Sequence, residues 1–245
     1  SLFIVFAKVE GDRFTAFIIE KNYDGVSIGP EEKKMGLKGS STCSVILDNV
    51  KVPKENIIGE IGRGHIIALN VLNIGRHKIA ATSLGTAKHA IELAITYANQ
   101  RRQFGKPLSS FHLIKDKIAD MVIKTYVNES SIYRTAGLLE KSFNQLADQE
   151  DVASAISNLA VECSINKVMS TETLDFVVDE ALQMHGGYGY MTEYEIETLY
   201  RDSRITRIFE GTNEINRLNI ASTILKTYEK PIEQTKAQDG ILIQE

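Results

Sequence analysis

The sequence predicts a mainly α protein, in which a four-helix up-down bundle follows a partial antiparallel β region. The spacing of hydrophobic residues changes from a period near two to a helical period at about Gly64. Long helix-like segments then follow one another, and short breaks rich in glycine and serine join them. We therefore expect residues 1–60 to form a partial β domain, 61–230 a helical bundle domain and 231–245 a polar tail.

The β region begins with a hairpin pattern. The apolar stretches Leu2–Ala7 and Phe14–Ile19 flank the turn-like Glu10–Arg13. Shorter strands are predicted at Gly25–Ile28 and Cys43–Leu47. These strands are too few to close a sandwich, so the β domain is expected to be partial.

The helical region consists of stretches with apolar residues at helical spacing. Short breaks between long helices favour antiparallel neighbours. The predicted helices are Gly64–Gln100, a helix after the serine cap at Ser110 that runs through Leu113 to Leu139, Asp151–Met184 and Thr212–Tyr228.

Composition excludes several classes of protein. Of the 245 residues, 43% are hydrophobic and 24% are charged, which argues against disordered and fibrous chains. The formal net charge is -4 and the basic residues are dispersed, so nucleic acid is a poor candidate partner. No apolar run approaches the roughly 20 residues that a membrane-spanning helix needs, and the first residues lack the basic flank of a signal peptide. We expect no transmembrane segment, and a cytosolic location as the default.

Cysteine and histidine give no sign of a metal site. Cys43 and Cys163 lack the paired spacing of a zinc site or a redox dithiol, and both are expected to be reduced packing residues. His185 has no second His, Cys or acid at ligand spacing around it. We therefore expect no bound metal.

An acidic residue, Glu210, stands just before the last predicted helix, within Arg207–Ile215. The partial positive charge of a helix N-terminus favours an ionised carboxylate, whereas the apolar neighbours Ile208 and Phe209 disfavour it by desolvation. A carboxylate under these two opposing influences is suited to act as a general base. Taken alone, an acid at a helix start is an ordinary complement to the helix dipole, so this assignment depends on other motifs.

Those motifs lie at predicted helix and strand ends, and their order along the chain is far more specific than any one of them. The segments are Val50–Pro53, Asn73–Arg76, Arg101–Lys106, Gln183–Tyr190 and Arg207–Ile215. Together they resemble the acyl-CoA dehydrogenase family, and the sequence Ile208–Asn213 is similar to that of its very-long-chain branch.

The resemblance covers essentially the whole chain. It implies the second half of the family's middle β domain and its C-terminal helical domain, with earlier β strands and an N-terminal helical domain expected before Ser1. The chain therefore resembles a piece of a longer protein, and the isolated piece is expected to be inactive. The tail after Lys230 is expected to be disordered, or else to lead into a further helical region as in the very-long-chain branch.

The resemblance also implies an activity, namely α,β-dehydrogenation of fatty acyl-CoA thioesters to trans-2-enoyl-CoA. FAD is the implied cofactor and hydride acceptor, and electron-transfer flavoprotein the implied electron acceptor. A homodimer or homotetramer is expected. The expected location is the cytoplasm of a bacterium, or the mitochondrial matrix if the protein is eukaryotic.

Site residues follow from the resemblance position by position. Glu210 maps onto the family base, because the alternative position of that base is Gly75 here. The small Gly75 also leaves room for a medium-to-long or longer acyl chain. Asn73, Arg76 and Gly211 map onto substrate contacts. The implied FAD contacts are Arg101, Phe104, His112, Gln183, Met184, His185, Gly186, Gly187, Thr212, Asn213 and Glu214.

Simpler roles stand beside these assignments. Arg76 also suits a salt bridge on the helix surface, and Thr212 an N-cap. Arg101 complements a helix C-terminus, while Gly186 and Gly187 suit a C-cap. One residue departs from the family pattern, because His112 stands where many members have Gln.

Two other functions remain open at this point. A non-catalytic helical oligomerisation or assembly domain would explain the long amphipathic helices. An acyl-CoA oxidase would share the bundle and the base but let oxygen reach the reduced flavin.

Overall fold

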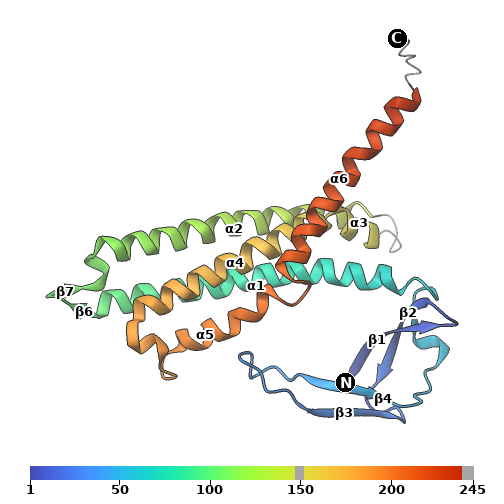
Figure 1. Ribbon diagram of the computed structural model, residues 1–245, viewed down its shortest axis with the longest axis horizontal. Helices are drawn as coiled ribbons and strands as arrows, with labels where there is room; N and C mark the ends of the chain where they lie inside the picture. The colour runs from blue at the N-terminus through green and yellow to red at the C-terminus, as the bar shows by residue number, and fades with distance from the viewer. Residues whose placement is uncertain (147–151, 239–245) are drawn as a thin grey trace.

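The computed structural model describes residues 1–146 and 152–238. Figure 1 shows a layered bundle of long helices with a small β region beneath one end of it. The predicted fold class, a mainly helical bundle preceded by antiparallel strands, is confirmed.

The N-terminal strands form the predicted hairpin. Strands β1 (Leu2–Val9) and β2 (Arg13–Glu20) pair antiparallel, and β5 (Ile57–Ile58) pairs with the other side of β2. The β2 strand also carries the start of the bundle, since a Cβ on Gly64 would lie 2.9 Å from Thr15 Cα. Only glycine permits that approach of helix to strand.

The remaining strands form separate pairs in the part of the chain that the structure describes. One pair consists of β3 (Val26–Glu31) and β4 (Cys43–Leu47), as the sequence predicts. The other, β6 (Arg102–Gln103) with β7 (Lys106–Pro107), forms a small hairpin after the first helix. Short 3-10 turns lie at Lys54–Asn56, Leu108–Ser110, Gly186–Tyr190 and Arg204–Arg207.

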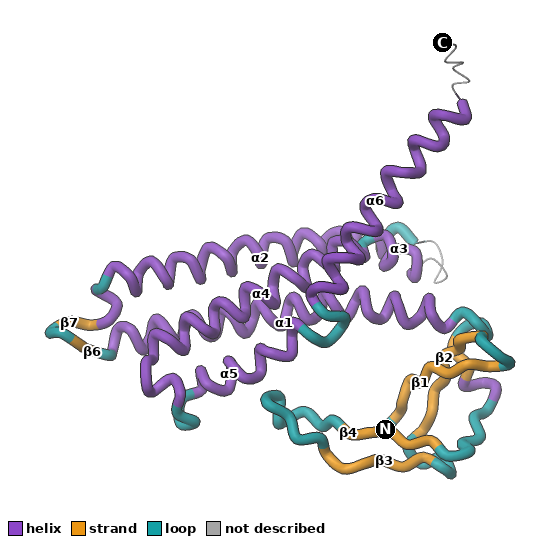
Figure 2. The backbone as a smooth tube through the Cα atoms, in the orientation of Figure 1, coloured by secondary structure: helices purple, strands orange, loops and turns teal. Residues whose placement is uncertain are grey.

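Three long helices, α1, α2 and α4, run alternately up and down the bundle (Figures 1 and 2). The short α5 and the first turns of α6 pack against α4 and share the fourth position. The helices are α1 (Gly64–Gln100), α2 (His112–Asn144), α3 (Val152–Asn158), α4 (Ala160–His185), α5 (Glu195–Ser203) and α6 (Asn213–Gln238).

The structure differs from the predicted helices in four places. The α2 helix continues past the predicted Leu139 to Asn144. The third predicted helix is broken at Leu159 into α3 and α4, and its expected first residue, Asp151, lies outside the described residues. The α5 helix was not predicted. The α6 helix continues past Tyr228 to Gln238, so the expected polar tail is helical up to that residue, and 239–245 lie outside the described residues.

The seam between α1 and α4 is lined by small residues. Four alanines of α1, spaced by three or four residues, are almost completely buried there, and Ala181 of α4 belongs to the same cluster. Small side chains let two helix backbones pack closely over many turns. The alanines of α1 in this cluster are Ala87, Ala90, Ala94 and Ala98.

The seam between α2 and α4 is polar by contrast. Asn166 donates from Nδ2 to Thr135 Oγ1 at 2.8 Å and accepts from Ser131 Oγ at 2.5 Å. Further along, Ser170 Oγ donates to Asn128 Oδ1 at 3.2 Å. Because buried polar groups are costly when unpaired, these pairs fix how α2 and α4 are aligned.

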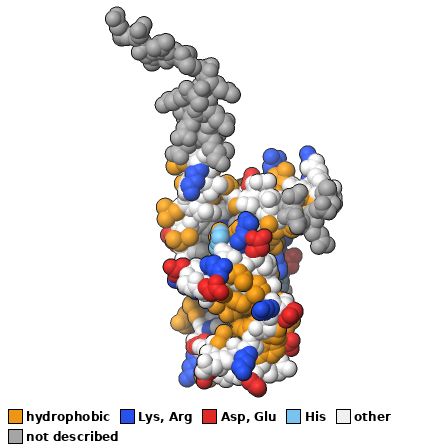
Figure 3. Space-filling model, turned by 90° about the vertical axis from the view of Figure 1, so that its right-hand side faces the viewer, with side chains coloured by type: hydrophobic (Ala, Val, Ile, Leu, Met, Phe, Trp, Pro, Cys, Tyr) orange, Lys and Arg blue, Asp and Glu red, His pale blue; other side chains and the backbone are white. Residues whose placement is uncertain are grey.

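Apolar side chains also lie on the outside of the β hairpin. Leu2 and Ile4 of β1 are exposed, and Figure 3 shows hydrophobic side chains gathered on the face at this end of the molecule. No helix within residues 1–146 and 152–238 is both long enough and apolar enough to span a bilayer.

We expect Ala94→Leu to lower the free energy of unfolding by about 1–3 kcal/mol, because the added atoms have no space in the closely packed seam. Ala94 has no exposed surface. Ala81, which is exposed on the same helix, gives the matched control Ala81→Leu. Denaturant unfolding of both variants checks this, and equal stabilities would contradict the proposed packing constraint.

Candidate active site

The segment between the 3-10 turn Arg204–Arg207 and α6 reverses the direction of the chain. Glu210 has a φ of 56° and Gly211 a φ of 79°, so two consecutive residues adopt the left-handed backbone conformation. For a residue with a Cβ, such as Glu210, this costs about 1–2 kcal/mol. Such a conformation persists only where the surrounding structure holds it in place.

Donors from three helices hold this segment through its backbone carbonyls. Arg76 Nε of α1 donates to Glu210 O at 3.2 Å, and Lys167 Nζ of α4 donates to Gly211 O at 2.8 Å. Asn216 Nδ2 of α6 donates to Gly211 O at 2.8 Å and to Thr212 O at 3.0 Å. All three donor side chains are buried. The backbone of the segment is therefore fixed while the carboxylate of Glu210 is not used as an anchor.

That carboxylate lies against the backbone of α1. A Cβ on Gly75 would lie 2.6 Å from Glu210 Oε2 and 2.8 Å from Cδ, so a larger residue at this position would displace the carboxylate. Oε2 is buried and has no hydrogen-bond partner among the described residues. Buried polar atoms are usually paired, so this carboxylate oxygen is a candidate functional group.

Glu210 borders a cavity of about 650 Å³ between the start of α1 and α3. Its walls are mainly apolar, and its size is within the range of small-molecule sites. The lining residues are Ile66, Ile67, Asn70, Val71, Ile74, Gly75, Lys78, Val152, Ala153, Ile156 and Glu210.

Arg76 is buried beneath this segment, where it bonds to other parts of the protein. Its NH1 donates to Asn73 Oδ1 at 2.9 Å and to Ser164 Oγ at 3.4 Å. Burial lowers the pKa of Arg76, while the carboxylate of Glu210 acts in the opposite direction. The predicted substrate contacts Asn73, Arg76 and Gly211 therefore lie together around Glu210.

Lys167 is a buried residue of this site that the sequence analysis did not identify. Besides Gly211 O, its Nζ contacts Asn213 Oδ1 at 2.7 Å. Burial and then the charge of Arg76 lower its pKa from 10.5 to about 8, whereas Glu214 and Glu210 raise it. Its spacing could have predicted its burial. Lys167 lies four residues after Cys163 and four before Thr171, and both of these are buried on the same face of α4.

The three predicted FAD contacts at the start of α6 face different ways. Asn213 points inward, where Nδ2 donates to Thr171 Oγ1 at 3.0 Å. Thr212 caps the helix, because its hydroxyl accepts from Ile215 N at 3.3 Å. Glu214 is exposed, and hydrogen bonds to its own backbone N–H and to Thr212 lower its pKa. Thr212 and Glu214 are thus closer to solvent than Asn213.

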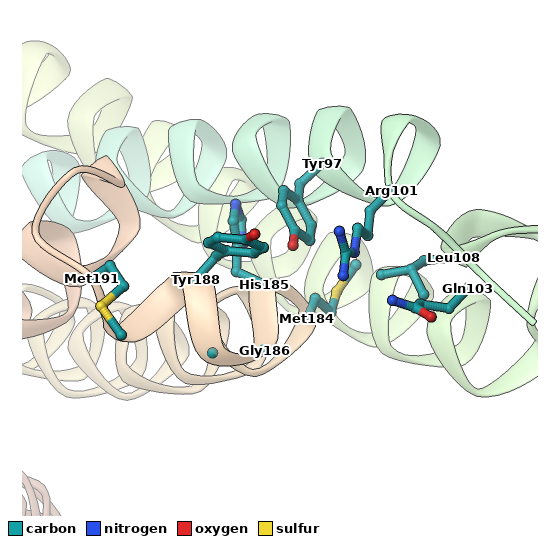
Figure 4. A pocket seen from close by; sticks show the side chains of 10 residues that line it. Tyr97, Arg101, Gln103, Leu108, Met184, His185, Gly186, Tyr188 and Met191 are labelled. Atoms are coloured by element: carbon teal, nitrogen blue, oxygen red, sulfur yellow. The ribbon is translucent and has the colours of Figure 1, made fainter.

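A second cavity, of about 600 Å³, lies at the other end of α1. Figure 4 shows Arg101 and Tyr97, from the end of α1, directed toward Met184 and Tyr188. The guanidinium carbon of Arg101 is 5.5 Å from the centre of the Tyr188 ring. The lining residues are Tyr97, Arg101, Gln103, Leu108, Met184, His185, Gly186, Gly187, Tyr188 and Met191.

His185 is held in a defined orientation within this cavity. Its ring stacks on Tyr97 with centroids 4.2 Å apart, and Nδ1 lies 2.7 Å from Ala181 O. Since a carbonyl can only accept, Nδ1 carries the proton and Nε2 is left as an acceptor. Burial is the main cause of the lowered pKa of His185, which favours the neutral ring.

The glycines beside His185 leave the cavity open. Gly186 has a φ of 59°, which favours glycine, and a Cβ at Gly186 or Gly187 would meet no atom within 4 Å. Open space above a glycine backbone permits close approach of a ligand.

The structure therefore brings together Arg101, Met184, His185, Gly186 and Gly187, as the resemblance implies. The other predicted FAD contacts at this end, Phe104, His112 and Gln183, are exposed and do not line the cavity. The Phe104 side chain is 90% exposed, so on this chain alone it contacts mainly solvent. Within the described residues, no group of three or more His, Cys, Asp or Glu is arranged to hold a metal ion.

In the original protein we expect Lys167 to make the free energy of unfolding rise between pH 8 and 10.5. We expect the variant Lys167→Met to lack this rise. Between pH 8 and 10.5 the unfolded chain binds a proton at Lys167 more readily than the folded one, so this lysine makes stability rise with pH. Below pH 8 its unfavourable contribution is complete, on the order of 3 kcal/mol.

The check is denaturant unfolding of both proteins at several pH values from 7 to 10.5, in the full-length protein that carries this chain. The neutral amine still donates to Gly211 O, so the original protein keeps that hydrogen bond at high pH. Parallel stability curves for the two proteins would show that Lys167 is not perturbed by burial.

Three comparisons place this geometry among known proteins. The family model for the C-terminal domain of acyl-CoA dehydrogenase matches residues 62–225. A probable acyl-CoA dehydrogenase of Bacillus subtilis is 58% identical over 230 residues, covering 92% of this chain and 39% of the relative. The mitochondrial very long-chain specific acyl-CoA dehydrogenase of Macaca fascicularis is 39% identical, covering 90% of this chain and 33% of the relative.

A solved acyl-CoA dehydrogenase structure has a similar fold. The acyl-CoA dehydrogenase of Bacillus anthracis, complexed with FAD, has a TM-score of 0.91 and 56% identity, covering 94% of this chain and 41% of that chain. The chain thus spans about two fifths of the length of these bacterial relatives. From the family match over residues 62–225, together with this fold, the chain belongs to the acyl-CoA dehydrogenase family.

Proposed function

We propose that this chain is the C-terminal part of an FAD-dependent acyl-CoA dehydrogenase that converts fatty acyl-CoA thioesters to trans-2-enoyl-CoA, with Glu210 as the base. The observation that carries the proposal is the buried, unpaired Oε2 of Glu210 at the border of a large apolar cavity. The base takes the proton from the carbon next to the thioester carbonyl, and that C–H bond breaks as the C=C bond forms.

The residues of the chain supply positioning and electrostatics for this step. Arg76, Lys167 and Asn216 hold the backbone around Glu210, so the carboxylate meets the substrate without rearranging its main chain. Leaving the carboxylate oxygen without an internal donor keeps it free to accept a proton. The mainly apolar walls of the cavity offer a surface on which an acyl chain can pack.

The second cavity fits part of an FAD molecule. Arg101 provides a cation for a phosphate, and the open space above Gly186 and Gly187 admits a nucleotide close to the backbone. When bound, FAD supplies the acceptor for the hydride that leaves the β-carbon. Near the base, Thr212 and Glu214 are the predicted contacts that face solvent and can reach a cofactor.

The distance between the two regions supports an oligomer. Gly75, beside the base, and Tyr97, in the second cavity, lie on one continuous helix and are roughly 33 Å apart at 1.5 Å per residue. This separation favours two FAD molecules, one in each region, over a single FAD that contacts both regions of one protomer. We infer a homodimer or homotetramer, in which Arg101 and Phe104 serve the FAD of a neighbouring subunit.

The acyl chain is proposed to occupy the cavity between α1 and α3. Its apolar walls and volume of about 650 Å³ favour medium-to-long or longer chains. Electron-transfer flavoprotein is the proposed electron acceptor, in the bacterial cytoplasm or the mitochondrial matrix. Turnover of only the shortest members of an acyl-CoA series would exclude the proposed chain length.

We expect Glu210→Gln to remove the reaction while leaving FAD bound, because the amide keeps the shape of the side chain but cannot accept the proton. The measurement is anaerobic titration of the FAD-loaded full-length protein with a long-chain acyl-CoA, followed by flavin absorbance. The rate of bleaching is expected to fall by at least about 100-fold.

The control is the original protein, which should bleach fully under the same conditions. Bleaching at an unchanged rate in Glu210→Gln would contradict the assignment of the base. Bound FAD with no bleaching at any chain length in the original protein would favour the helical assembly domain. Rapid turnover with oxygen in place of electron-transfer flavoprotein would favour the acyl-CoA oxidase.

A smaller change at the same contact gives a second test. Gly75→Ala is expected to slow bleaching by about tenfold or more, because its Cβ would overlap the Glu210 carboxylate and displace it. Gly85→Ala is the matched control, since a Cβ there would meet no atom within 4 Å. Equal rates for the two variants would show that the position of the carboxylate is not set by Gly75.

A further inference from the structure

The connection between β3 and β4 reaches across to α5. Leu37 N donates to Asp202 Oδ1 at 2.5 Å, and Arg201 NH1 donates to Met35 O at 2.9 Å. These two hydrogen bonds join the β region to the end of α5, more than 160 residues away along the chain. We call Met35–Leu37, together with Arg201 and Asp202, the latch.

The fit within the latch is tight. A Cβ on Gly36 would lie 2.6 Å from Asp202 Oδ1 and 2.7 Å from Arg201 O, distances at which the backbone itself would have to move. Leu37 has a φ of 49°, an uncommon conformation for a leucine. A strained residue next to a glycine that admits no side chain indicates that the surrounding contacts determine the shape of the loop.

The α5 side of the latch is held independently. Arg201 Nε donates to Glu197 Oε2 at 2.7 Å, and its NH2 donates to Glu197 Oε1 at 3.0 Å. The hydrogen bond from Arg201 is the main cause of the lowered pKa of Glu197. Two parallel bonds between a guanidinium and a carboxylate fix orientation as well as distance. Arg201 therefore presents its third nitrogen, NH1, to Met35 in a fixed direction.

A short, well-bonded turn connects the latch to the base. Thr206 Oγ1 donates to Ser203 O at 2.7 Å, and Ile208 N donates to Ile205 O at 2.8 Å. These hydrogen bonds give the short segment between Asp202 and Glu210 a defined shape.

A second connection passes through space. Leu37 and Phe209 both line a cavity of about 220 Å³ between α1, α4 and α5. Phe209 directly precedes Glu210, so the loop of the β region borders the same cavity as the residue next to the base. The latch thus approaches the base both along the chain and across this cavity.

We propose that the latch is a positioning element for the base: the Met35–Leu37 loop, by holding Asp202, sets where Glu210 lies relative to Gly75. This inference rests on the proposed function for the role of Glu210 as the base. Asp202 and Gly36 are positioning residues in this scheme, since neither borders the cavity that contains Glu210.

The test compares Asp202→Ala, Gly36→Ala and Asp202→Asn in the FAD-loaded full-length protein. Asparagine keeps an oxygen that can accept from Leu37 N, so it should rescue the alanine variant. The matched control is Glu195→Ala, which removes the contact of Glu195 Oε1 with His89 Nε2 at 2.9 Å, a tether between α5 and α1 at the other end of α5.

Two kinds of measurement are made. The first is the rate constant of anaerobic flavin bleaching at saturating long-chain acyl-CoA, together with the dissociation constant of that substrate. The second is hydrogen exchange at the backbone amides of Ile208 and Phe209, which both bond to Ile205 O. The exchange measurement needs no reaction and therefore tests the latch separately from the proposed function.

We expect Asp202→Ala and Gly36→Ala to lower the rate constant by about tenfold, with a dissociation constant changed less than about threefold. Amide exchange at Ile208 and Phe209 should become faster in both. Asp202→Asn and Glu195→Ala should stay close to the original protein. If Asp202→Ala does not fold, Gly36→Ala and Asp202→Asn make the same comparison.

Two outcomes would overturn the inference. One is an unchanged rate constant and unchanged exchange in Asp202→Ala and Gly36→Ala. The other is equal slowing in Glu195→Ala, which would show that any loosening of α5 has the same effect. If no acyl-CoA of any chain length bleaches the flavin of the original protein, the proposed function fails. In that case, unchanged amide exchange in Asp202→Ala and Gly36→Ala alone decides against the latch.

Discussion

The position of the candidate base depends on buried hydrogen bonds to the backbone carbonyls of Glu210, Gly211 and Thr212. Two of the donors, Arg76 and Lys167, are cations in a place where burial lowers the pKa of each. Buried charges are costly unless they are paired and hydrogen-bonded. Here carbonyl dipoles and the nearby carboxylate offset that cost, and the same bonds hold two residues in the left-handed conformation. The strain of the segment and the burial of the cations therefore stabilise one another.

Much of the fold follows from the sequence because its main elements are long and strongly periodic. The limits of α1 and the β hairpin agree with the predicted ones within a few residues, since hydrophobic spacing decides both. The break at Leu159 was not predicted because the apolar pattern continues through it, although Ser157 and Asn158 have lower helix propensity than their neighbours. The α5 helix was missed because nine residues after a run of glycine and tyrosine give too short a pattern.

The sequence was a weaker guide to the site. It predicted Glu210 as the base from its motif and from the small residue at Gly75, and the structure places the two in contact. It did not identify Lys167, because a lysine in a helix is normally taken to face solvent. It also did not show that Asn213 turns inward while Thr212 and Glu214 do not. The directions of these side chains depend on the left-handed turn before α6. The spacing of hydrophobic residues in the sequence does not predict that turn.

Steric contact, more than hydrogen bonding, sets the direction of the Glu210 side chain. The carboxylate rests on Gly75, where one added carbon would overlap it, and its Oε2 has no donor among the described residues. The backbone of the segment is thus held by hydrogen bonds, and the side chain is placed by its contact with the backbone of α1. The same principle operates at Gly36, where close backbone packing rather than a longer side chain joins the β region to α5. Small residues at two points of close approach thus allow a base that is fixed in place yet left without an internal donor.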